Sequence, residues 1–433
     1  MNFKPARHLG ALAVLACFTP LAAQATDGYF SHGYGMKAKG RGGAAIAMTD
    51  DAYGGANNPA TMVWAGGRVD AGLDLFSPQR SAERYGSAGG SLDFSVDSDS
   101  TLFVVPEFAY NTMYSKDLSL GVTVYGNGGM NTDYPGGQLN CSGFGGPSSA
   151  NGLCGDGNLG VDLSQLIVAP TVAWKFSENH SIGISPLLAY QRFEAYGIQL
   201  FSTFSSSPGN VSNNGYASST GWGVRVGYLG RLADSVTVGA SYASKMNMGN
   251  FDKYSGLFAG QGGFDIPENY GFGIAVKPAP EWLIAVDYVR INYSGVPSIG
   301  NQSNVQAPLG SSNGPGFGWT DVDVWKVGIE YKYDNKLTLR AGYNHSDDPV
   351  TPANVTFNIL APGVVQNHYT LGFTYALDKD SEITMAYTYA AENSVSGPSF
   401  FNNFSPPLPP GGGGQEKISM YQNSLGIAWA MRF

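Results

Sequence analysis

The residues with the clearest chemistry lie in one Gly-rich stretch near the amino terminus, residues 33–64. Three cations stand near its start: Lys37, Lys39 and Arg41. An acidic pair follows, Asp50 and Asp51, and then the corner Asn57-Asn58-Pro59-Ala60. Asn58 is a good helix N-cap and Pro59 a good first helical residue, so a short helical turn is expected there, with Asn58 also free to bond a surrounding wall. The cations have two possible partners: a carboxylate of a substrate, or acids of the chain such as Asp70, Asp74 and Glu107.

The histidines do not indicate an enzyme. His180 lies in a predicted turn at the opposite end of the molecule from His345 and His368, which end predicted strands, so no nucleophile and base are brought together. The His32-Gly33-Tyr34-Gly35 stretch lacks the flanking strand and the Lys-Ser/Thr of a nucleotide loop. No cluster has metal-ligand spacing. The sequence therefore predicts no catalytic residues, no metal and no cofactor.

The first 25 residues have the features of a secretory signal peptide. Lys4 and Arg7 precede an apolar run, and Ala23-Gln24-Ala25 supplies small residues for cleavage after Ala25. Cys17 loosely imitates a lipoprotein site, which leaves lipidation as an alternative. The two later cysteines, Cys141 and Cys154, lie in a Gly-, Ser- and Asn-rich loop and are expected to form a disulfide in an exported chain.

Composition favours a membrane barrel. Of the 433 residues, 13% are charged, 13% are aromatic and 60 are glycines, which is too little charge for a soluble surface. Cleavage would remove two cations and no acid and take the net charge from −9 to −11, which excludes nucleic acid as a partner. No run approaches the roughly 18 apolar residues of a membrane helix. A membrane-spanning structure would therefore have to be a closed β-barrel.

From Arg68 onward, segments of alternating character are joined by short turns and long loops in strict alternation. The short turns are predicted at residues 114–117, 177–180, 231–235, 277–281, 333–336 and 377–381. The long loops are predicted at residues 78–99, 127–162, 197–218, 247–269, 294–321, 345–367 and 392–417. This pattern predicts about fourteen antiparallel strands with periplasmic turns and external loops, as in bacterial outer-membrane barrels.

The alternation puts apolar residues outside. Tyr369, Leu371 and Phe373 share one register, whereas Thr370 and Gly372 share the other. A β-sandwich is the alternative, but its outer faces should carry Lys and Glu, and here they carry Gly, Ala, Ser and Thr. Most strand charges fall on the inner register, and aromatic residues gather at strand ends as interfacial girdles would: Tyr110, Tyr114, Trp174, Phe176, Trp325, Tyr331, Tyr333, Tyr387 and Tyr389.

The residues above resemble the FadL/TodX family of outer-membrane transport proteins. The resemblance rests on the Gly-rich lead with Asp50-Asp51 and Asn58-Pro59-Ala60, and on three later segments: Ile266-Pro267-Glu268, Leu339-Arg340-Ala341-Gly342-Tyr343 and His368-Tyr369-Thr370-Leu371-Gly372-Phe373. The chain also ends on the aromatic Phe433, which resembles the signal read by the barrel assembly machinery.

The resemblance implies a hatch at residues 26–66 inside a barrel at residues 67–433. It implies passive, monomeric uptake of hydrophobic small molecules through an outer membrane with its lipid and lipopolysaccharide, most often long-chain fatty acids. Monoaromatic hydrocarbons are the alternative substrate, and a general porin or a structural or adhesive barrel is the alternative function. The hatch residues Asp50, Asp51, Asn58, Pro59 and Ala60 would gate.

The resemblance also implies a lateral exit at an inward kink of the third strand. Here Gly126, Gly128 and Gly129 follow that strand, where missing side chains weaken pairing. The sequence departs from the fatty-acid branch in its external loops, because residues 197–218 and 247–269 are mostly Ser, Asn and Gly. Their few apolar residues (Leu200, Phe201, Phe204, Leu257 and Phe258) form either a substrate patch or loop packing.

Overall fold

The computed structural model describes residues 27–404 and 407–433. The predicted signal peptide, residues 1–25 with Cys17, lies outside the described residues. In the described part, fourteen long antiparallel strands form one sheet that closes on itself where β1 pairs with β16. These strands are β1 (Arg68–Tyr85), β3 (Phe103–Ser115), β4 (Leu118–Tyr134), β5 (Leu159–Ser177), β6 (His180–Tyr196), β7 (Ala217–Ala233), β8 (Val236–Ala243), β10 (Asn269–Ala279), β11 (Trp282–Ile291), β12 (Val322–Lys332), β13 (Leu337–Ser346), β14 (Asn367–Ala376), β15 (Ser381–Pro398) and β16 (Gln415–Arg432). Two short strands, β2 (Phe94–Asp97) and β9 (Asn247–Met248), pair with β1 and β7.

The closed barrel confirms the predicted fold and removes the sandwich alternative. Each predicted short turn lies between two consecutive strands, because its polar residues can reverse the chain in two to four positions. Alternation also has the predicted sense: Tyr369 and Leu371 are 53% and 62% exposed, whereas Thr370 is buried. Apolar residues therefore cover the outside of the wall, and small or polar residues face the lumen.

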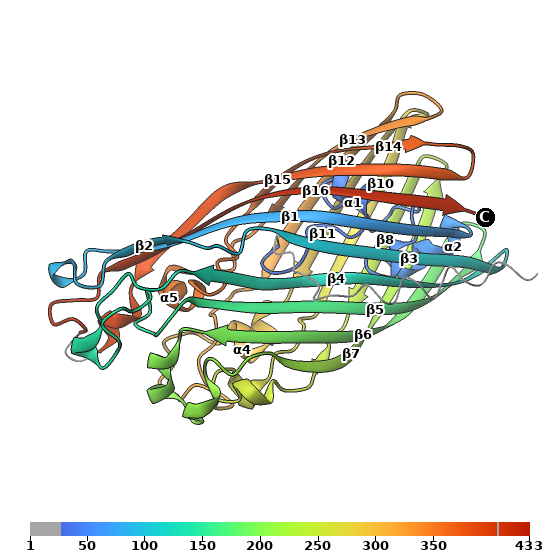
Figure 1. The fold of residues 1–433 in the computed structure, drawn as a ribbon. Coiled ribbons are helices and arrows are strands. Elements are labelled where there is room, and N and C mark those ends of the chain that lie inside the picture. The colour runs from blue at the N-terminus through green and yellow to red at the C-terminus, as the bar shows by residue number, and fades with distance from the viewer. Residues whose placement is uncertain (1–26, 405–406) are drawn as a thin grey trace, which may run out of the picture.

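The wall has a tall side and a short side (Figure 1). On the tall side, β1, β4 to β7, β15 and β16 are 17–19 residues long, and β3 has 13. On the short side, β8 and β10 to β14 have 8–11 residues. Several predicted loop starts are therefore strand. β1 continues through Pro78 to Tyr85, and β4 continues through the predicted glycine break at Gly126 to Tyr134, because β16 and β5 supply the partners for these extensions.

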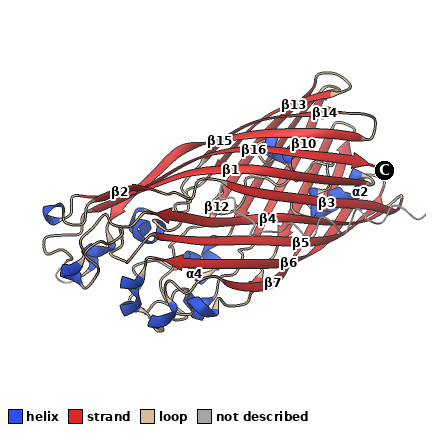
Figure 2. Cartoon of the chain, viewed as in Figure 1, coloured by secondary structure: helices blue, strands red, loops and turns tan. Residues whose placement is uncertain are grey.

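Residues 27–67, the described segment before β1, lie inside the barrel and are called the hatch below. It contains α1 (Met36–Gly40), the 3₁₀ turns Tyr53–Gly55 and Pro59–Thr61, and α2 (Met62–Ala65). The other helices lie in the external loops, at the end of the barrel away from the carboxyl terminus (Figure 2). They are α3 (Ala259–Gly262), α4 (Pro297–Gly300), α5 (Val355–Asn358) and the 3₁₀ turns Ala88–Gly90, Ser142–Phe144, Gln199–Phe204, Pro208–Asn210, Asp252–Tyr254, Tyr293–Gly295, Pro352–Asn354 and Phe400–Asn403.

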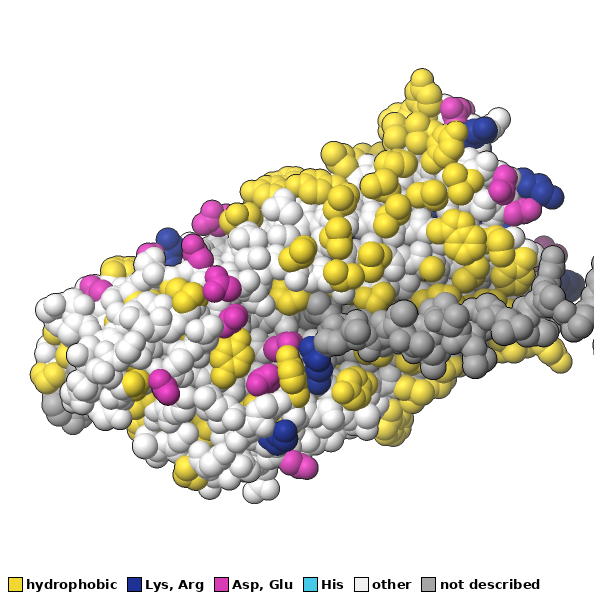
Figure 3. All heavy atoms as spheres, viewed as in Figure 1, with side chains coloured by type: hydrophobic (Ala, Val, Ile, Leu, Met, Phe, Trp, Pro, Cys, Tyr) yellow, Lys and Arg dark blue, Asp and Glu magenta, His cyan; other side chains and the backbone are white. Residues whose placement is uncertain are grey.

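The surface separates by chemistry along the barrel axis. Hydrophobic side chains crowd the strands toward the carboxyl-terminal end, and the loop end is largely polar (Figure 3). The predicted girdle residues are exposed, for example Tyr114 at 75% and Trp325 at 54%, and Tyr331 is half-buried. None of the helices in the described residues combines the length and the apolarity that crossing a membrane requires. The largest apolar cluster lies among the external loops and the first residues of the hatch.

Candidate functional site

Asn58 joins the hatch to the barrel wall. Its side-chain oxygen accepts from the Ala60 N–H over 3.1 Å, which caps the turn that begins at Pro59. Its Nδ2 donates to the Ile46 carbonyl (2.8 Å) in the hatch and to the Tyr228 carbonyl (2.9 Å) in β7. The residue is fully buried. One side chain therefore links two parts of the hatch and one strand of the wall.

Glycines on the lumen face let the hatch approach the wall closely. A Cβ built on Gly183 would lie 2.4 Å from the Pro59 backbone, and one on Gly227 would lie 1.9 Å from Asn58 Oδ1. On the other side, Gly342 meets the backbone at Gly42 in the same way. Any side chain at these positions would collide with the hatch. The sequence shows that these glycines lie on the inward register, but only the position of the hatch explains why glycine is needed there.

The three hatch cations are paired with carboxylates of the chain. Lys37 Nζ lies 2.7 Å from Glu382 Oε1, Lys39 Nζ lies 2.5 Å from Asp74 Oδ2, and Arg41 Nη1 lies 2.7 Å from Asp50 Oδ2. All three cations are buried. Of their two predicted kinds of partner, the structure provides acids of the chain, and among the acids named from the sequence it provides Asp74. The contact with a substrate carboxylate stays a prediction. A charge in this environment is stable when an opposite charge accompanies it.

The acidic pair of the hatch has structural partners as well. Asp50 accepts two hydrogen bonds from the Arg41 guanidinium, over 2.7 and 3.1 Å. Asp51 accepts from the Tyr53 N–H over 2.9 Å and so begins the 3₁₀ turn there. Both residues therefore hold the fold of the hatch.

Residues 27–31, called the arm, extend from the hatch into the apolar cluster beneath the loops. Phe30 forms a β-bridge with Gly128 of β4, and the Gly129 N–H donates to the Tyr29 carbonyl over 3.1 Å. The Tyr29 ring lies 5.3 Å from Tyr293, 6.0 Å from Trp319 and 6.3 Å from Phe264. The arm therefore fills an aromatic cluster with its own rings. No sequence motif indicates this cluster, although Tyr29 and Phe30 follow the predicted cleavage site closely.

The wall beside the arm has an unpaired stretch, called the window. Strands β3 and β4 are paired only as far as Phe108 and Val124. Beyond this pair β3 stays with β1 and β4 stays with β5. The two sides meet again where the Asp99 N–H donates to the Asp133 carbonyl over 2.8 Å. Side chains fill the stretch between: a Cβ built on Gly126 would lie 3.2 Å from Val105 Cγ1.

A β-bulge shapes the inner edge of the window. The register of β4 against β5 shifts between Gly126 and Gly128, so Asn127 is the extra residue. Its carbonyl accepts from the Ser31 N–H (3.2 Å), and its Nδ2 donates to Gln165 Oε1 (2.9 Å). Gln165 donates in turn to Gln191 Oε1 over 3.0 Å. The structure thus places Gly126, Gly128 and Gly129 at an irregularity of the third barrel strand, and a buried amide row (Asn127, Gln165, Gln191) supports it.

An apolar groove lies among the external loops. It has a volume of about 440 Å³, and its lining contains no charged residue in the described part of the chain. Its aromatic lining residues are Phe201, Phe204, Phe357, Phe400 and Phe404. A smaller apolar cavity of about 30 Å³ shares Phe201, Phe357 and Leu309 with it and reaches Leu360, next to the aromatic cluster. Of the predicted loop residues, Phe201 and Phe204 thus line the groove, whereas Phe258 packs on Phe193 and Phe264.

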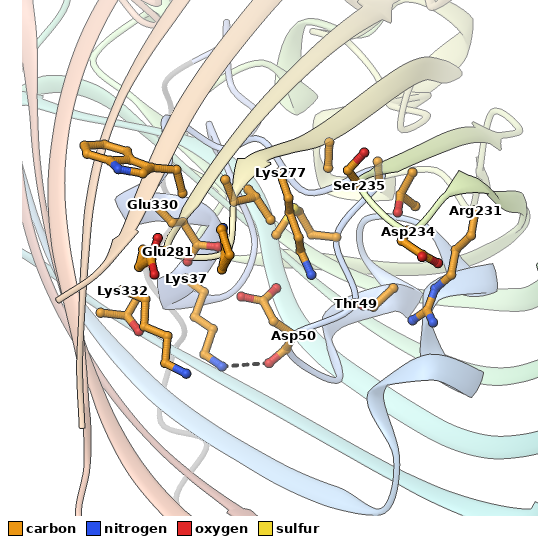
Figure 4. Close-up of a pocket in the computed structure, with 18 of the residues that line it drawn as sticks. Lys37, Thr49, Asp50, Arg231, Asp234, Ser235, Lys277, Glu281, Glu330 and Lys332 are labelled. Carbon is orange, nitrogen blue, oxygen red and sulfur yellow. Dashed lines mark hydrogen bonds between the residues drawn. The ribbon is translucent and has the colours of Figure 1, made fainter. Parts of the chain in front are cut away.

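The opposite end of the hatch faces a charged vestibule of about 560 Å³. Figure 4 shows Lys37 and Asp50 of the hatch facing side chains from the short turns and the wall, among them Arg231, Lys277 and Glu330. The free energy of a hydrophobic molecule would rise in such surroundings, because the charged groups bind water strongly. The vestibule is therefore a poor route for an apolar solute.

The cysteines and histidines have local roles. Cys141 and Cys154 are joined by a disulfide in the loop between β4 and β5. His32 of the hatch stacks on His368 of β14 with ring centroids 5.7 Å apart, His180 bonds Tyr228, and His345 bonds Asn367. Each histidine of the described residues therefore lies against a structural neighbour.

A closed barrel sealed by its own amino-terminal segment, with an apolar groove outside and a charged vestibule below, defines a plugged outer-membrane channel. The family model described as outer membrane protein transport protein (OMPP1/FadL/TodX) matches residues 12–399, and the chain belongs to this family. The family consists of transport proteins for hydrophobic compounds, so the chain is an outer-membrane transporter and not an enzyme.

Solved structures show the same fold. The toluene transporter TodX of Pseudomonas putida is 19% identical, with a TM-score of 0.67 over 93% of this chain and 99% of that one. A FadL homologue of Pseudomonas aeruginosa is 14% identical, with a TM-score of 0.67 over 94% and 100%. The toluene transporter TbuX of Ralstonia pickettii is 18% identical, with a TM-score of 0.63 over 93% and 99%. No curated protein matches the chain.

Proposed function

We propose that hydrophobic small molecules enter this protein at the external groove, replace the arm in the aromatic cluster and leave sideways through the window into the outer membrane. The movement is passive. The described residues provide apolar surfaces one after another along the route, so the route needs no site for an energy source. Barrel assembly through Phe433 and contact of the loops with lipopolysaccharide remain expectations that accompany this proposal.

The observation that carries the proposal is the position of the window. At the window β3 and β4 share no ladder hydrogen bonds, and the Val105 side chain lies between them, next to Gly126. Separation there breaks no ladder hydrogen bonds. Beside it Leu75 of β1, Val104 of β3 and Leu102, which precedes β3, are exposed, which suits an exit into hydrocarbon and not into water. The arm lies on the inner side, bridged to Gly128.

Long-chain fatty acids and monoaromatic hydrocarbons are both compatible with the groove. Its charge-free lining favours an apolar body of either kind. The similarity to two toluene transporters makes an aromatic hydrocarbon a natural second candidate. A general porin is disfavoured because the hatch occupies the lumen, and its central residues, such as Ala44, Ala52 and Asn58, are fully buried.

The test is a reversible cross-link across the window. Cysteines at Val105 and Gly126 would face each other, because a Cβ on Gly126 reaches the Val105 side chain. Oxidation of V105C/G126C should abolish uptake of both laurate and toluene in proteoliposomes, and a reductant should restore it. The single variants V105C and G126C control for reduction of the native Cys141–Cys154 bond. Full uptake in the cross-linked protein would place the exit elsewhere.

A further inference from the structure

Arg80 of β1 differs from most other buried cations of the described barrel. It is 5% exposed, donates one hydrogen bond to the Ser100 carbonyl (3.1 Å) and lies 5.8 Å from the Phe103 ring. Within residues 27–404 and 407–433, no carboxylate lies at ion-pair distance from it. By contrast Lys39, Arg41, Arg68 and Arg84, all equally buried, have carboxylate partners within 2.5–2.7 Å. A buried cation without a counter-ion is costly, so an anionic partner is missing.

The position of Arg80 shows where that partner would come from. Arg80 lines a cavity of about 10 Å³ together with Tyr29 of the arm, Trp319 of the aromatic cluster, and Gly129 and Met130 of the window. It therefore lies at the point where the proposed path turns from the cluster to the window. Its other neighbours there, which include Met420 and Asn131, carry no charge.

Arg225 is a second buried cation without an ion pair in the described residues, and it serves as a comparison. It donates to the Asn57 carbonyl, and its cavity beneath the arm also contains the carboxylates Asp27 and Asp287. An incoming anion would meet these two acids there. No acid lines the Arg80 cavity.

We infer that Arg80 binds the carboxylate of an amphipathic substrate, a single negative charge on a long apolar body, and so sets a preference for fatty acids over hydrocarbons. This inference rests on the proposed route. The cavity at Arg80 is too small for a carboxylate with its chain, so the ligand enters when Tyr29 and the arm move aside. The guanidinium then gains its counter-ion, with bidentate geometry available, and the alkyl chain takes the place of the arm rings.

The experiment compares laurate with methyl laurate, which has the same apolar chain and no charge. Binding is measured on the full-length protein in lipid nanodiscs, both by titration and by the rise in thermal midpoint that a ligand specific to the native state produces. For the wild type, laurate should bind more tightly and raise the midpoint more than its ester. Arg80→Met should weaken laurate binding by about tenfold to a hundredfold, the range for hydrogen bonds to a charged group, and leave methyl laurate unchanged.

Two further variants separate ligand binding from structure. Arg80→Lys keeps the charge and should recover most of the preference for laurate. Arg192→Gln removes an external arginine that already pairs with Asp162, and both ligands should bind it as they bind the wild type. The ligand-free Arg80→Met protein should be no less stable than the wild type, because an uncompensated charge is lost. Equal weakening of both ligands, or of neither, would overturn the inference.

The cross-link across the window distinguishes this failure from a failure of the route. If oxidised V105C/G126C blocks laurate and methyl laurate alike while Arg80→Met changes neither, the route holds and the role of Arg80 is wrong. If the cross-link blocks the uptake of neither ligand, the proposed route is wrong. The difference in affinity between laurate and methyl laurate for Arg80→Met still tests the role of Arg80 separately.

Discussion

Asn58 in the hatch donates a hydrogen bond to the carbonyl of Tyr228 in β7 over 2.9 Å, while its side-chain oxygen caps the next turn. Removing the side chain in Asn58→Ala leaves the carbonyls of Ile46 and Tyr228 and the Ala60 N–H without this partner. We expect a loss of about 3 kcal/mol in stability at roughly 1 kcal/mol per bond, and a larger relative loss of uptake because the hatch loses its registration on the wall.

Asn57→Ala is the matched control for that experiment. The Asn57 amide donates to the Tyr34 carbonyl within the hatch, over 2.9 Å, and does not bond the wall. Thermal unfolding and laurate uptake are measured for both variants. Equal uptake defects in the two would show that the bond between Asn58 and β7 has no special role.

The hatch cations should act on stability and not on substrate charge. Lys39→Gln leaves the fully buried Asp74 without its lysine, at a cost of about 3–5 kcal/mol for breaking a buried pair. Lys37→Gln should cost less, because Glu382 keeps Arg68 and Arg432. Uptake of laurate and toluene should fall together in each variant. A selective loss of laurate uptake would return these lysines to the role of carboxylate contacts.

Deletion of residues 26–64 should convert the protein into a pore. The hatch fills the lumen between the groove and the charged vestibule, and its removal exposes the inward Asp, Glu, Lys and Arg side chains to water. Single-channel conductance in planar bilayers, or entry of a small sugar into proteoliposomes, measures the effect. A deleted barrel that stays sealed and still takes up laurate would contradict the assignment of this segment as the hatch.

The amide row should hold the bulge at the window. Gln165→Met removes the acceptor of Asn127 and the donor to Gln191 with little change of volume. We expect faster hydrogen exchange at residues 126–131 of β4 and lower uptake, because the extra residue of the bulge loses its support. Ser185→Ala is the control. It removes a side-chain hydrogen bond to Thr171 that joins β5 and β6, the strands of Gln165 and Gln191, but lies outside the row. Unchanged exchange in Gln165→Met would argue against this support.

Asp348 should make one external loop sensitive to pH. Burial raises the pKa of its carboxyl group from 3.8 to about 7, although the hydrogen bond from the Val350 N–H lowers this pKa. Between pH 3.8 and about 7 the folded loop therefore binds more protons than the unfolded chain. The stability that the protonated carboxyl group contributes is present below pH 3.8 and is lost as the pH rises through about 7. Proteolysis of residues 347–366 should be faster at pH 8 than at pH 6.

Replacing Asp348 by Asn should abolish that difference, because the amide has no proton to lose and can still accept from the Val350 N–H. Asp347→Asn, at the exposed neighbouring position, should behave as the wild type. A pH dependence that persists in Asp348→Asn would assign it to another group.

The sequence by itself determined the barrel. Period-two alternation, with Tyr369 and Leu371 against Thr370 and Gly372, and the polar short turns are local signals, because each depends on neighbours a few residues away. The same holds for the Asn58-Pro59 turn, whose cap lies within two residues. The sequence does not predict the outer ends of β1 and β4, since Pro78 and Gly126 look like breaks and only the distant partners β16 and β5 extend these strands.

The tertiary structure alone decided what the charged and polar side chains do. Lys39 and Arg80 are both flanked by uncharged residues in the sequence, but one lies 2.5 Å from Asp74 and the other faces uncharged residues and the arm. Nor does any local pattern show that Asn127, Gln165 and Gln191 share one row across three strands. Ion pairing and desolvation depend on distances of a few ångströms between residues far apart in the chain, and closure of the barrel around the hatch sets those distances.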